Sequence, residues 1–392
     1  MKITNVQAIC LKYPYERPIA DGCTPCYARS AVLVRVETDT QLYGLGEAAT
    51  FGGNLDAMKV IVERQLAPLL VGEDPLDIER LWNKLVWNNW SAGRRGMVMG
   101  GISGIDIALW DLLGKAAGMP LYRLLGANAH RVQGYASAGY YAPGKEAGEL
   151  ERELEGYCAM GFSDFKMKIG RVRGMISSPL RYMKGGDWAY SYEQDAARIA
   201  AARRVIGPGA RLMVDMNCTW DPDAVVAGEQ MFREYGVYWV EEPTRSDDVR
   251  SYARIAASLK STLVAGIESE QGLARYSELV EMGALDVVQA NLGWAGGITE
   301  ARRIAALALA HGKMFTPHTF FSAVLNAANV HFSASLSNVP FIECELNPNP
   351  LRTDLLKRNL EMDEHMCFIL PQGPGLGIEV DWEKAEQYIY KT

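Results

Sequence analysis

The feature that most constrains the fold is an alternation of short apolar runs with amphipathic segments, which begins near residue 130. Such an alternation is typical of parallel strands joined by crossover helices. Eight strand-helix units in about 215 residues predict a TIM-like (β/α) barrel, which usually takes about 250 residues, with a doubly wound sheet as the alternative. The expected strands are Val132–Ser137, Asp164–Lys168, Leu212–Asp215, Tyr238–Glu241, Leu263–Gly266, Leu285–Gln289, Met314–Pro317 and Phe341–Glu343.

The segments on either side of this repeat have a different pattern. Strand-like runs precede helical patterns in the first part, and this order is typical of an α+β unit. The tail contains a glycine-rich turn and little barrel-like rhythm, so we expect it to fold back on the N-terminal unit. The sequence therefore predicts three parts: residues 1–128, residues 129–351 and residues 352–392.

Composition narrows the classes of partner. The 40 basic and 47 acidic residues give a net charge of −7, which argues against a nucleic-acid partner because phosphate binding needs clustered Lys and Arg. We expect neither a membrane span nor a signal peptide. The 7 scattered cysteines predict reduced thiols in a cytoplasmic protein. We interpret Cys23 and Cys26 as a loop coincidence rather than a zinc or redox site.

Three carboxylates follow three successive predicted strands at the spacing of one strand-helix unit. They are Asp215, Glu241 and Glu268. The carboxyl ends of barrel strands meet at one face, so these groups are expected to converge. Packed like charges raise one another's pKa unless a cation neutralises them, and an all-oxygen ligand set suits Mg²⁺. The pattern predicts a magnesium site, with Glu270 as the fallback for Glu268.

Candidate proton-transfer groups end other strands. Lys166 and Lys168 alternate with apolar residues, so both side chains point to the same side, where two close ammonium groups are expected to lower each other's pKa. His318 ends the seventh strand and is expected across the barrel from them, which gives one base on each side of a substrate. Glu343 ends the eighth strand and could, if protonated or partnered, hydrogen-bond to a substrate carboxylate oxygen.

Each of these residues alone is more often a solvated or salt-bridged group, but the whole set on successive strands favours a site. Other polar residues lack that placement. We interpret Asp106 and Asp111 as supports of the domain junction, and Gly293–Gly297 and Gly373–Gly377 as turns. The remaining histidines are expected at the surface or in the core: His130, His311, His331 and His365.

Several short motifs occur in a fixed order along nearly the whole chain. They are Gly44-Leu45-Gly46-Glu47, Gly104-Ile105-Asp106-Ile107-Ala108-Leu109-Trp110-Asp111, Lys166-Met167-Lys168, Asp215-Met216-Asn217, Val240-Glu241-Glu242-Pro243, Pro317-His318 and Gly373-Pro374-Gly375-Leu376-Gly377. In this order they resemble the mandelate racemase subgroup of the enolase superfamily.

The resemblance has implications for fold and chemistry. It implies that the N-terminal and C-terminal segments form a capping domain, whose loops near 19–29 and 48–54 cover the site and choose the substrate. It implies a homo-oligomer, often an octamer. The implied roles are a Lys168 base assisted by Lys166, His318 on the opposite face, and Mg²⁺ bound by Asp215, Glu241 and Glu268.

Two departures from the family pattern concern the opposite face and the third ligand. Relatives usually place an aspartate beside the histidine, whereas this chain has Asn291, which carries no charge and weakens the pull of His318 for protons. Ile267 stands where glycine is common. The asparagine reduces the support for a mechanism with two bases, whereas the isoleucine weakens the alignment of the third ligand, Glu268, for which Glu270 is the fallback.

A third feature is an insertion after the second strand. Residues Arg171–Tyr190 contain Arg173, Arg181, Lys184 and Trp188 among glycines and serines. A long loop after a barrel strand lies over the active-site face, so Arg171 is a candidate for binding an anionic, hydroxylated substrate. A surface excursion or a subunit contact is the alternative.

The favoured reaction is dehydration of an acid sugar to a 2-keto-3-deoxy acid through an enediolate. The alternatives are racemization or epimerization, lactone cycloisomerization, and a non-catalytic binding or structural barrel. The substrate would be a small carboxylate. Candidate substrate contacts near the strand ends are Ser137, Tyr140, Asn217 and Trp294, together with Arg171.

Overall fold

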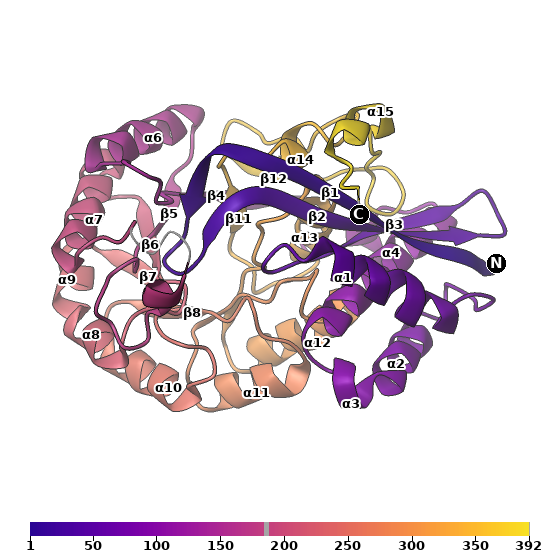
Figure 1. The fold of residues 1–392 in the computed structure, drawn as a ribbon, viewed down its shortest axis with the longest axis horizontal. Helices are drawn as coiled ribbons and strands as arrows, with labels where there is room; N and C mark the ends of the chain where they lie inside the picture. The colour runs from indigo at the N-terminus through magenta and orange to yellow at the C-terminus, as the bar shows by residue number, and fades with distance from the viewer. Residues whose placement is uncertain (184–187, 392) are drawn as a thin grey trace.

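The N-terminal unit begins with a three-stranded antiparallel sheet. The computed structural model describes residues 1–183 and 188–391. Its sheet has the order β1 (Ile3–Ala20), β2 (Pro25–Thr38) and β3 (Tyr43–Ala48). The β1–β2 hairpin is long, and Figure 1 shows it running from the capping unit across to the strands β5 and β6 of the second unit. The sheet therefore connects the two units.

Helical segments follow this sheet. They are α1 (Leu55–Val60), η1 (Ile61–Leu66), η2 (Ala67–Leu69), α2 (Ile78–Asn88), α3 (Trp90–Gly93), α4 (Met97–Ala116) and α5 (Leu121–Leu124). Of these, α1, α4 and the η1–η2 segment pack directly on the sheet. Helix α4 lies directly against β3, and glycines permit that approach. A Cβ atom at Gly44 would lie 1.9 Å from the Ala108 carbonyl oxygen, and one at Gly46 would lie 2.2 Å from that of Gly104. The Gly-Leu-Gly-Glu motif is thus a packing motif.

Helix α4 corrects one expectation. It is long and apolar enough to cross a membrane by length and composition, although the sequence was not expected to contain such a stretch. The structure gives the reason for its apolar character, because 83% of the apolar window is buried inside the protein. The helix contacts β3 on one side and α12 (Gly297–Ala310) on another. It is the core helix of the N-terminal unit.

The second unit is a barrel of parallel strands, as predicted. Its neighbour order is β10-β9-β8-β7-β6-β5-β4-β11, in which β4 to β10 follow the sequence and the last strand, β11, pairs with the first, β4. A doubly wound sheet would reverse its order at one point, so that alternative is wrong. The strands are β4 (Arg131–Ala138), β5 (Asp164–Lys168), β6 (Arg211–Asp215), β7 (Val237–Glu241), β8 (Leu263–Gly266), β9 (Val287–Val288), β10 (Met314–Phe315) and β11 (Ile342–Glu345).

Helices surround the barrel strands on the outside (Figure 1). Two strands, β9 and β10, are shorter than predicted. Strand β10 stops before Pro317, which has no N–H to donate to a ladder. The helices and turns are α6 (Ala147–Met160), η3 (Pro179–Tyr182), α7 (Tyr192–Ile206), α8 (Pro222–Ala227), α9 (Glu229–Glu234), α10 (Val249–Ser258), α11 (Leu273–Glu281), α12 and α13 (Ala323–Ala334).

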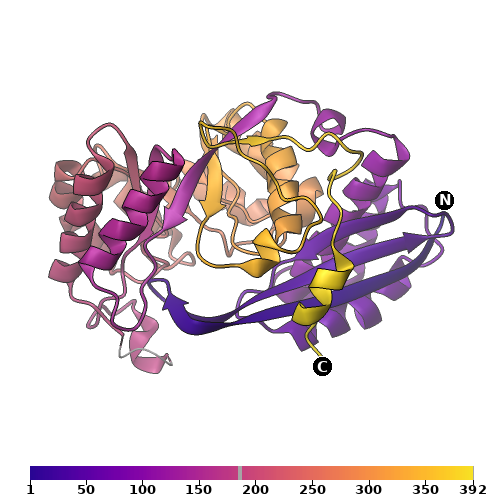
Figure 2. The ribbon, with the colours of Figure 1, turned by 90° about the horizontal axis from the view of Figure 1, so that it is seen from above.

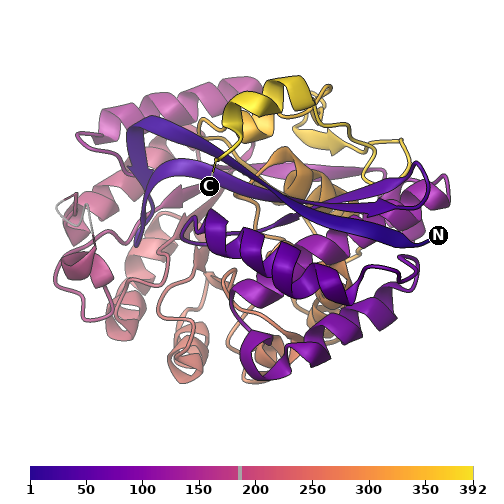
Figure 3. The same cartoon turned by 45° about the vertical axis from the view of Figure 1, so that its right-hand side comes forward.

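The C-terminal segment returns to the N-terminal unit. It contains α14 (Pro350–Thr353), β12 (Cys367–Ile369), α15 (Trp382–Ala385) and η4 (Glu386–Tyr388). Strand β12 pairs antiparallel with β4, and Tyr390 N donates to Cys10 O at 2.9 Å. Figures 2 and 3 show the tail lying beside the N-terminal strands. The expected return of the tail is confirmed, whereas the limits at residues 128 and 351 stay predictions.

Buried carboxylates hold the units together. Asp106 on α4 accepts hydrogen bonds from Thr299 N at 2.9 Å and Thr299 Oγ1 at 2.6 Å, which links the capping unit to α12 of the barrel. Asp111 accepts from Leu45 N at 2.8 Å and Leu376 N at 2.7 Å. It therefore joins β3 to the C-terminal turn. The two acids have the supporting role that the sequence predicts.

Glu47 makes a second connection between the units. This buried carboxylate at the end of β3 accepts hydrogen bonds from Ser322 N at 3.0 Å, Ser322 Oγ at 2.5 Å and Leu325 N at 2.9 Å. The N–H donors belong to the first turn of α13, where helices leave such groups unsatisfied. Burial raises the pKa of Glu47 to about 7. The cap thus fixes the loop that carries His318.

Candidate active site

The three predicted metal ligands lie together at the face where the carboxyl ends of the barrel strands meet, called here the strand-end face. Asp215 ends β6, Glu241 ends β7 and Glu268 follows β8. One carboxylate oxygen from each residue lies within 4.8 Å of one oxygen of each of the other two, and all three side chains are buried. Parallel strands in register place them side by side, since Asp215 pairs with Glu241. The predicted convergence is present.

A strained backbone turns Glu268 into the site. Ile267 has φ of 71°, in the left-handed region that costs a β-branched residue about 1–2 kcal/mol. This conformation explains why glycine suits the position. The fallback ligand Glu270 points into another network, where it accepts a hydrogen bond from Ser246 Oγ at 2.8 Å and pairs with Arg275 at 3.3 Å. Glu268 is therefore the third member of the cluster.

The electrostatics of the cluster favour a bound cation. Burial and neighbouring negative charges raise the pKa of Glu241 to about 7 and raise that of Glu268 well above its usual range. The pKa of Asp215 is lowered instead, because Lys168 and Lys166 outweigh its burial. Among the described residues, Glu268 Oε2 has no partner of good hydrogen-bond geometry, although His318 Nε2 lies 3.2 Å away. The donor set fits a hard divalent ion.

The two lysines occupy the predicted face, but their charge state differs from the expectation. Lys166 Nζ lies 2.5 Å from Glu241 Oε1 and 2.8 Å from Glu343 Oε1, while Lys168 Nζ pairs with Asp215. Burial disfavours the ammonium forms, but these carboxylates raise both lysine pKa values well above the usual range. The expected lowering by mutual repulsion is therefore wrong for the protein without a metal ion, because attraction to adjacent acids dominates.

Glu343 has two partners at the end of the barrel. Its Oε1 pairs with Lys166, and its Oε2 accepts a hydrogen bond from Thr319 N at 2.9 Å. Burial alone would raise the pKa of Glu343, but Lys166 and His318 help lower it to about 2. Of the two states predicted for this residue, the structure has the partnered, ionised one.

His318 lies beside Glu268, whereas Lys168 lies beside Asp215, and Asn291 orients the histidine ring. Asn291 Nδ2 lies 2.8 Å from His318 Nδ1, while Gly293 N donates to Asn291 Oδ1 at 2.9 Å. The backbone donor fixes the amide with its NH₂ group toward the imidazole. His318 Nδ1 therefore accepts, and the neutral ring carries its proton on Nε2. Burial lowers the pKa of His318 to about 4.

Aromatic side chains form the walls near His318 and Lys168. Phe51, in the loop after β3, lies with its ring 6.0 Å from that of His318 and 5.2 Å from that of Trp294. Tyr140 has its ring centroid 5.0 Å from Lys168 Nζ. The sequence analysis predicted that the loop containing Phe51 covers the site, but it did not single out Phe51. The position of its ring beside His318 depends on how the capping unit docks on the barrel. Trp294 and Tyr140 lie at the face where substrate contacts were predicted.

Arg171 and Asn217 contact the tip of the long hairpin. Asn217 Oδ1 accepts from Gly22 N at 3.2 Å, and its Nδ2 donates to Asp215 Oδ2 at 3.3 Å. Arg171 is fully buried and donates to Asp21 O at 3.2 Å and to Trp188 O at 3.1 Å. Arg171 therefore connects the hairpin tip to the inserted segment. Its contact with substrate stays a prediction, and Lys184 lies outside the described residues.

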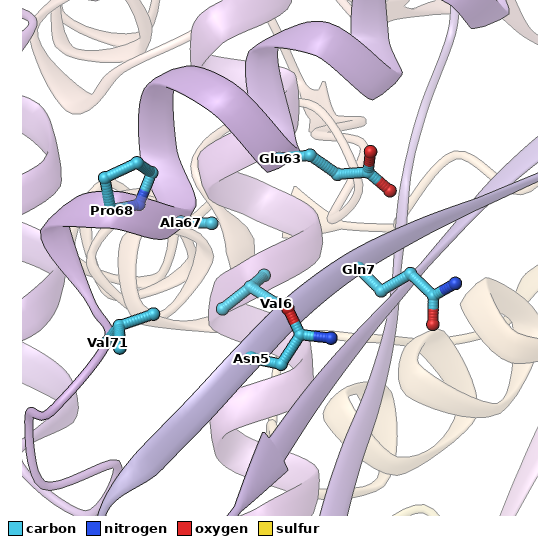
Figure 4. Close-up of a pocket in the computed structure, with 7 residues that line it drawn as sticks. All are labelled: Asn5, Val6, Gln7, Glu63, Ala67, Pro68 and Val71. Atoms are coloured by element: carbon cyan, nitrogen blue, oxygen red, sulfur yellow. The ribbon is translucent and has the colours of Figure 1, made fainter.

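A surface hollow elsewhere on the molecule lacks comparable chemistry. Figure 4 shows it between β1 and the η1–η2 segment. Glu63 lines it, and Glu63 Oε1 already accepts a hydrogen bond from Ala8 N at 3.1 Å. The other lining residues are Asn5, Val6, Gln7, Ala67, Pro68 and Val71. The convergent acids and bases place the candidate active site at the strand-end face instead.

Comparisons with known proteins agree with this placement. Residues 4–126 match the mandelate racemase/muconate lactonizing enzyme N-terminal domain, and residues 149–385 match the enolase C-terminal domain-like family. Among solved structures, a protein of Bordetella bronchiseptica RB50 superposes with a TM-score of 0.89 at 32% identity, covering 100% of this chain and 95% of that one. A Streptomyces coelicolor racemase with bound magnesium has a TM-score of 0.86 at 28% identity, covering 99% and 100%.

Curated relatives are enzymes of the lyase and isomerase type. Arabinonate dehydratase of Saccharolobus solfataricus is 34% identical over 362 residues, which is 92% of this chain and 91% of the relative. D-galactarolactone cycloisomerase of Agrobacterium fabrum is 31% identical over 399 residues, 99% of each. These names favour an enzyme over a non-catalytic barrel. The chain belongs to the mandelate racemase and muconate lactonizing enzyme family of the enolase superfamily.

Proposed function

We propose that this protein removes the proton next to the carboxylate of a sugar acid and then expels the 3-hydroxyl group, which yields a 2-keto-3-deoxy acid. The observation that carries the proposal is the arrangement of Lys168 and His318 on opposite sides of one buried acidic cluster. Dehydratase names among the relatives support this reaction. The substrate is a small hydroxylated carboxylate.

Mg²⁺ is the proposed cofactor, held by Asp215, Glu241 and Glu268. When bound, the ion supplies positive charge that stabilises the negative charge growing on the substrate carboxylate. The fit rests on the spacing of the carboxylate oxygens, their burial and the raised pKa values of Glu241 and Glu268. The Streptomyces racemase with bound magnesium supports the choice of ion.

Lys168 is the proposed base. In the structure its ammonium group pairs with Asp215, so Lys168 can be neutral only when another positive charge replaces it beside that carboxylate. Lys166 stays paired with Glu241 and Glu343 and contributes a second positive charge nearby. That charge disfavours the protonated form of Lys168 once Asp215 is engaged elsewhere. A neutral amine at this position can take the α-proton.

His318 is the proposed acid. Its Nε2 carries the proton and faces Glu268, on the substrate side of the ring. A ring in this tautomer can give the Nε2 proton to a departing hydroxyl, which leaves as water, and the ring then regains a proton from solvent. Before that transfer it has no lone pair at Nε2 with which to take a proton. One base and one acid suffice for β-elimination. Racemization and epimerization need a base on each face and are therefore disfavoured.

Lactone cycloisomerization is the second candidate, because a ring oxygen leaves in place of the hydroxyl and the same two groups serve. Two relatives named as cycloisomerases support it: the Agrobacterium enzyme, named for a lactone, at 31% identity, and a 3,6-anhydro-α-L-galactonate cycloisomerase of Streptomyces coelicolor, at 30% identity. The products separate the two reactions. Dehydration releases water from an open-chain acid, whereas cycloisomerization rearranges a cyclic substrate without loss of mass.

The experiment is a screen of sugar acids and their lactones with Mg²⁺, in which 2-keto acids are trapped with semicarbazide and masses are recorded. A product lighter than its open-chain substrate by one water establishes dehydration. A product of unchanged mass from a lactone establishes the second candidate. If the protein turns over neither open-chain sugar acids nor lactones, the proposal is contradicted. Separately, a cytoplasmic location and a homo-oligomer, with an octamer as the family-based expectation, stay predictions that cell fractionation and sedimentation can check.

A further inference from the structure

The tip of the β1–β2 hairpin is fixed on the strand-end face. Gly22 N donates to Asn217 Oδ1 at 3.2 Å. A Cβ atom at Gly22 would lie 2.6 Å from Met216 O and 2.7 Å from Ile169 O, the backbone atoms that follow β6 and β5. The main chain of the tip therefore touches the ends of the strands that carry Asp215 and Lys168. Figure 1 shows the hairpin reaching these strands.

Two further sets of hydrogen bonds hold the tip. Ala20 and Tyr141 exchange backbone hydrogen bonds of 2.8 Å in both directions, so the hairpin pairs with the segment after β4. Arg171 Nη1 donates to Asp21 O at 3.2 Å and to Cys23 O at 3.4 Å. The tip is thus bonded to segments that follow β4, β5 and β6. A side chain on it has a defined position relative to the catalytic groups.

Asp21 is the charged side chain at this tip. Its Oδ1 accepts hydrogen bonds from Cys23 N at 2.7 Å and from Thr24 N, which orients the carboxylate. Its Oδ2 has no hydrogen-bond partner among the described residues, and the side chain is half-buried. Burial raises the pKa of Asp21, and the charges that act on it across the interface are the attracting Lys168 and the repelling Asp215. The tip that carries this carboxylate therefore lies at the strand-end face, where the charges of Lys168 and Asp215 act on it.

We propose that Asp21 determines specificity by accepting a hydrogen bond from a hydroxyl of the substrate chain through Oδ2 and by repelling a second carboxylate. The inference rests on the proposed function and names its substrate class, which is the monocarboxylic sugar acids. A diacid of the same configuration would bring a negative charge to the place where the monoacid has a hydroxyl. Like charges at a partly buried site discriminate by repulsion as well as by lost hydrogen bonding.

The described cations near the tip already have partners. Arg29 Nη2 pairs with the buried Glu345 Oε1 at 2.7 Å. Arg171 donates to main-chain carbonyls of the tip and of Trp188. Lys168 pairs with Asp215. A second substrate carboxylate would therefore meet Asp21 without a described cation reserved for it, whereas a hydroxyl meets an acceptor.

Asp21→Asn is the informative variant. The amide keeps an Oδ1 acceptor for Cys23 N and Thr24 N, so the turn is retained, while the charge is lost and an Nδ2 donor replaces Oδ2. Asp74→Asn is the matched control, because Asp74 Oδ1 accepts from Leu76 N at 3.0 Å in a turn of the capping unit. This second variant changes the same group in a similar turn far from the strand-end face.

The measurement is kcat/KM for pairs of aldonic and aldaric acids of matched configuration, together with equilibrium binding of the same pairs by calorimetry with Mg²⁺ present. The wild type and Asp74→Asn are expected to prefer the monoacid. Asp21→Asn is expected to shift the monoacid-to-diacid ratio toward the diacid by about tenfold or more, in binding and in turnover.

The outcomes separate this inference from the proposed function. The role of Asp21 is overturned if the monoacid-to-diacid ratio is unchanged in Asp21→Asn, or if the wild type prefers diacids. In either case, turnover of any of these acids by dehydration leaves the dehydratase proposal standing. A shifted binding ratio without turnover of any acid supports Asp21 as a selectivity residue and contradicts the dehydratase proposal. If the protein binds neither the monoacid nor the diacid, both the role of Asp21 and the dehydratase proposal are overturned.

Discussion

Asn291 donates its amide hydrogen to His318 Nδ1 across 2.8 Å, and the N–H of Gly293 prevents the amide from turning over. This pair sets the chemistry of the opposite face of the site. An aspartate at position 291 would accept from Nδ1–H and leave Nε2 free to act as a base. The asparagine produces the reverse tautomer, in which Nε2 donates.

Asn291→Asp should therefore give the protein a second base. The added carboxylate attracts the imidazolium form, so the pKa of His318 should rise from the value of about 4 set by burial. We expect epimerization at the α-carbon to rise above the wild-type level. Chiral chromatography of the recovered substrate measures it. Asn291→Ser is the control, because it removes the amide without adding charge. Equal epimerization in wild type and Asn291→Asp would contradict the tautomer assignment.

His318→Asn should separate proton abstraction from hydroxyl loss. If His318 acts only as the acid, its removal should slow dehydration by roughly 10²- to 10⁴-fold while Lys168 continues to exchange the α-proton. Exchange of deuterium from solvent into recovered substrate, measured by mass spectrometry, checks this result. Loss of exchange in parallel with dehydration would instead make His318 the abstracting base.

The thermal stabilisation by Mg²⁺ should depend on pH. The folded-state pKa of Glu241 is raised to about 7, so the metal-free protein is stable at low pH and loses that contribution as pH rises from about 4.5, the ordinary value, through 7. Bound Mg²⁺ should relieve the repulsion that causes this loss. We expect the Tm shift on adding Mg²⁺ to be larger at pH 8 than at pH 5 in calorimetry, and to vanish in Glu268→Gln. A shift independent of pH would count against the site.

Glu47→Ala should destabilise the protein without touching the catalytic groups. The substitution leaves Ser322 N and Leu325 N buried without their acceptor, which typically costs about 2–4 kcal/mol. Urea denaturation should show a lower midpoint, and Glu47→Gln should recover part of the loss because it retains one acceptor oxygen. An unchanged midpoint in Glu47→Ala would show that water replaces the carboxylate.

The barrel was predictable from sequence because its signals are local. Short apolar runs at unit spacing, each ending in a polar residue, indicate parallel strands, and the topology then brings Asp215, Glu241 and Glu268 together. The spacing of these acids along the chain is therefore enough to predict that they are neighbours in the barrel. Glu343 and the lysines follow from the same reasoning, although their charge states do not.

Features that depend on docking between distant segments were not predictable in this way. Strand β1 continues past two prolines to Ala20 through an irregular register with β2, and the local alternation of apolar and polar residues does not show this extension. That extension brings the hairpin tip, which carries Asp21, to the strand-end face. The lysine pKa values likewise depend on carboxylates from other strands, and the sequence does not show that these outweigh lysine–lysine repulsion.

The most direct test of the central claim is proton NMR of sugar acids in D₂O with Mg²⁺, comparing wild type with Lys168→Ala. Wild type should lose the α-proton signal and form a new methylene signal, while the variant should be slower by roughly 10²- to 10⁴-fold in both and still bind its ligand. Unchanged α-proton loss in Lys168→Ala, or no spectral change with wild type across aldonic acids and lactones, would contradict the account.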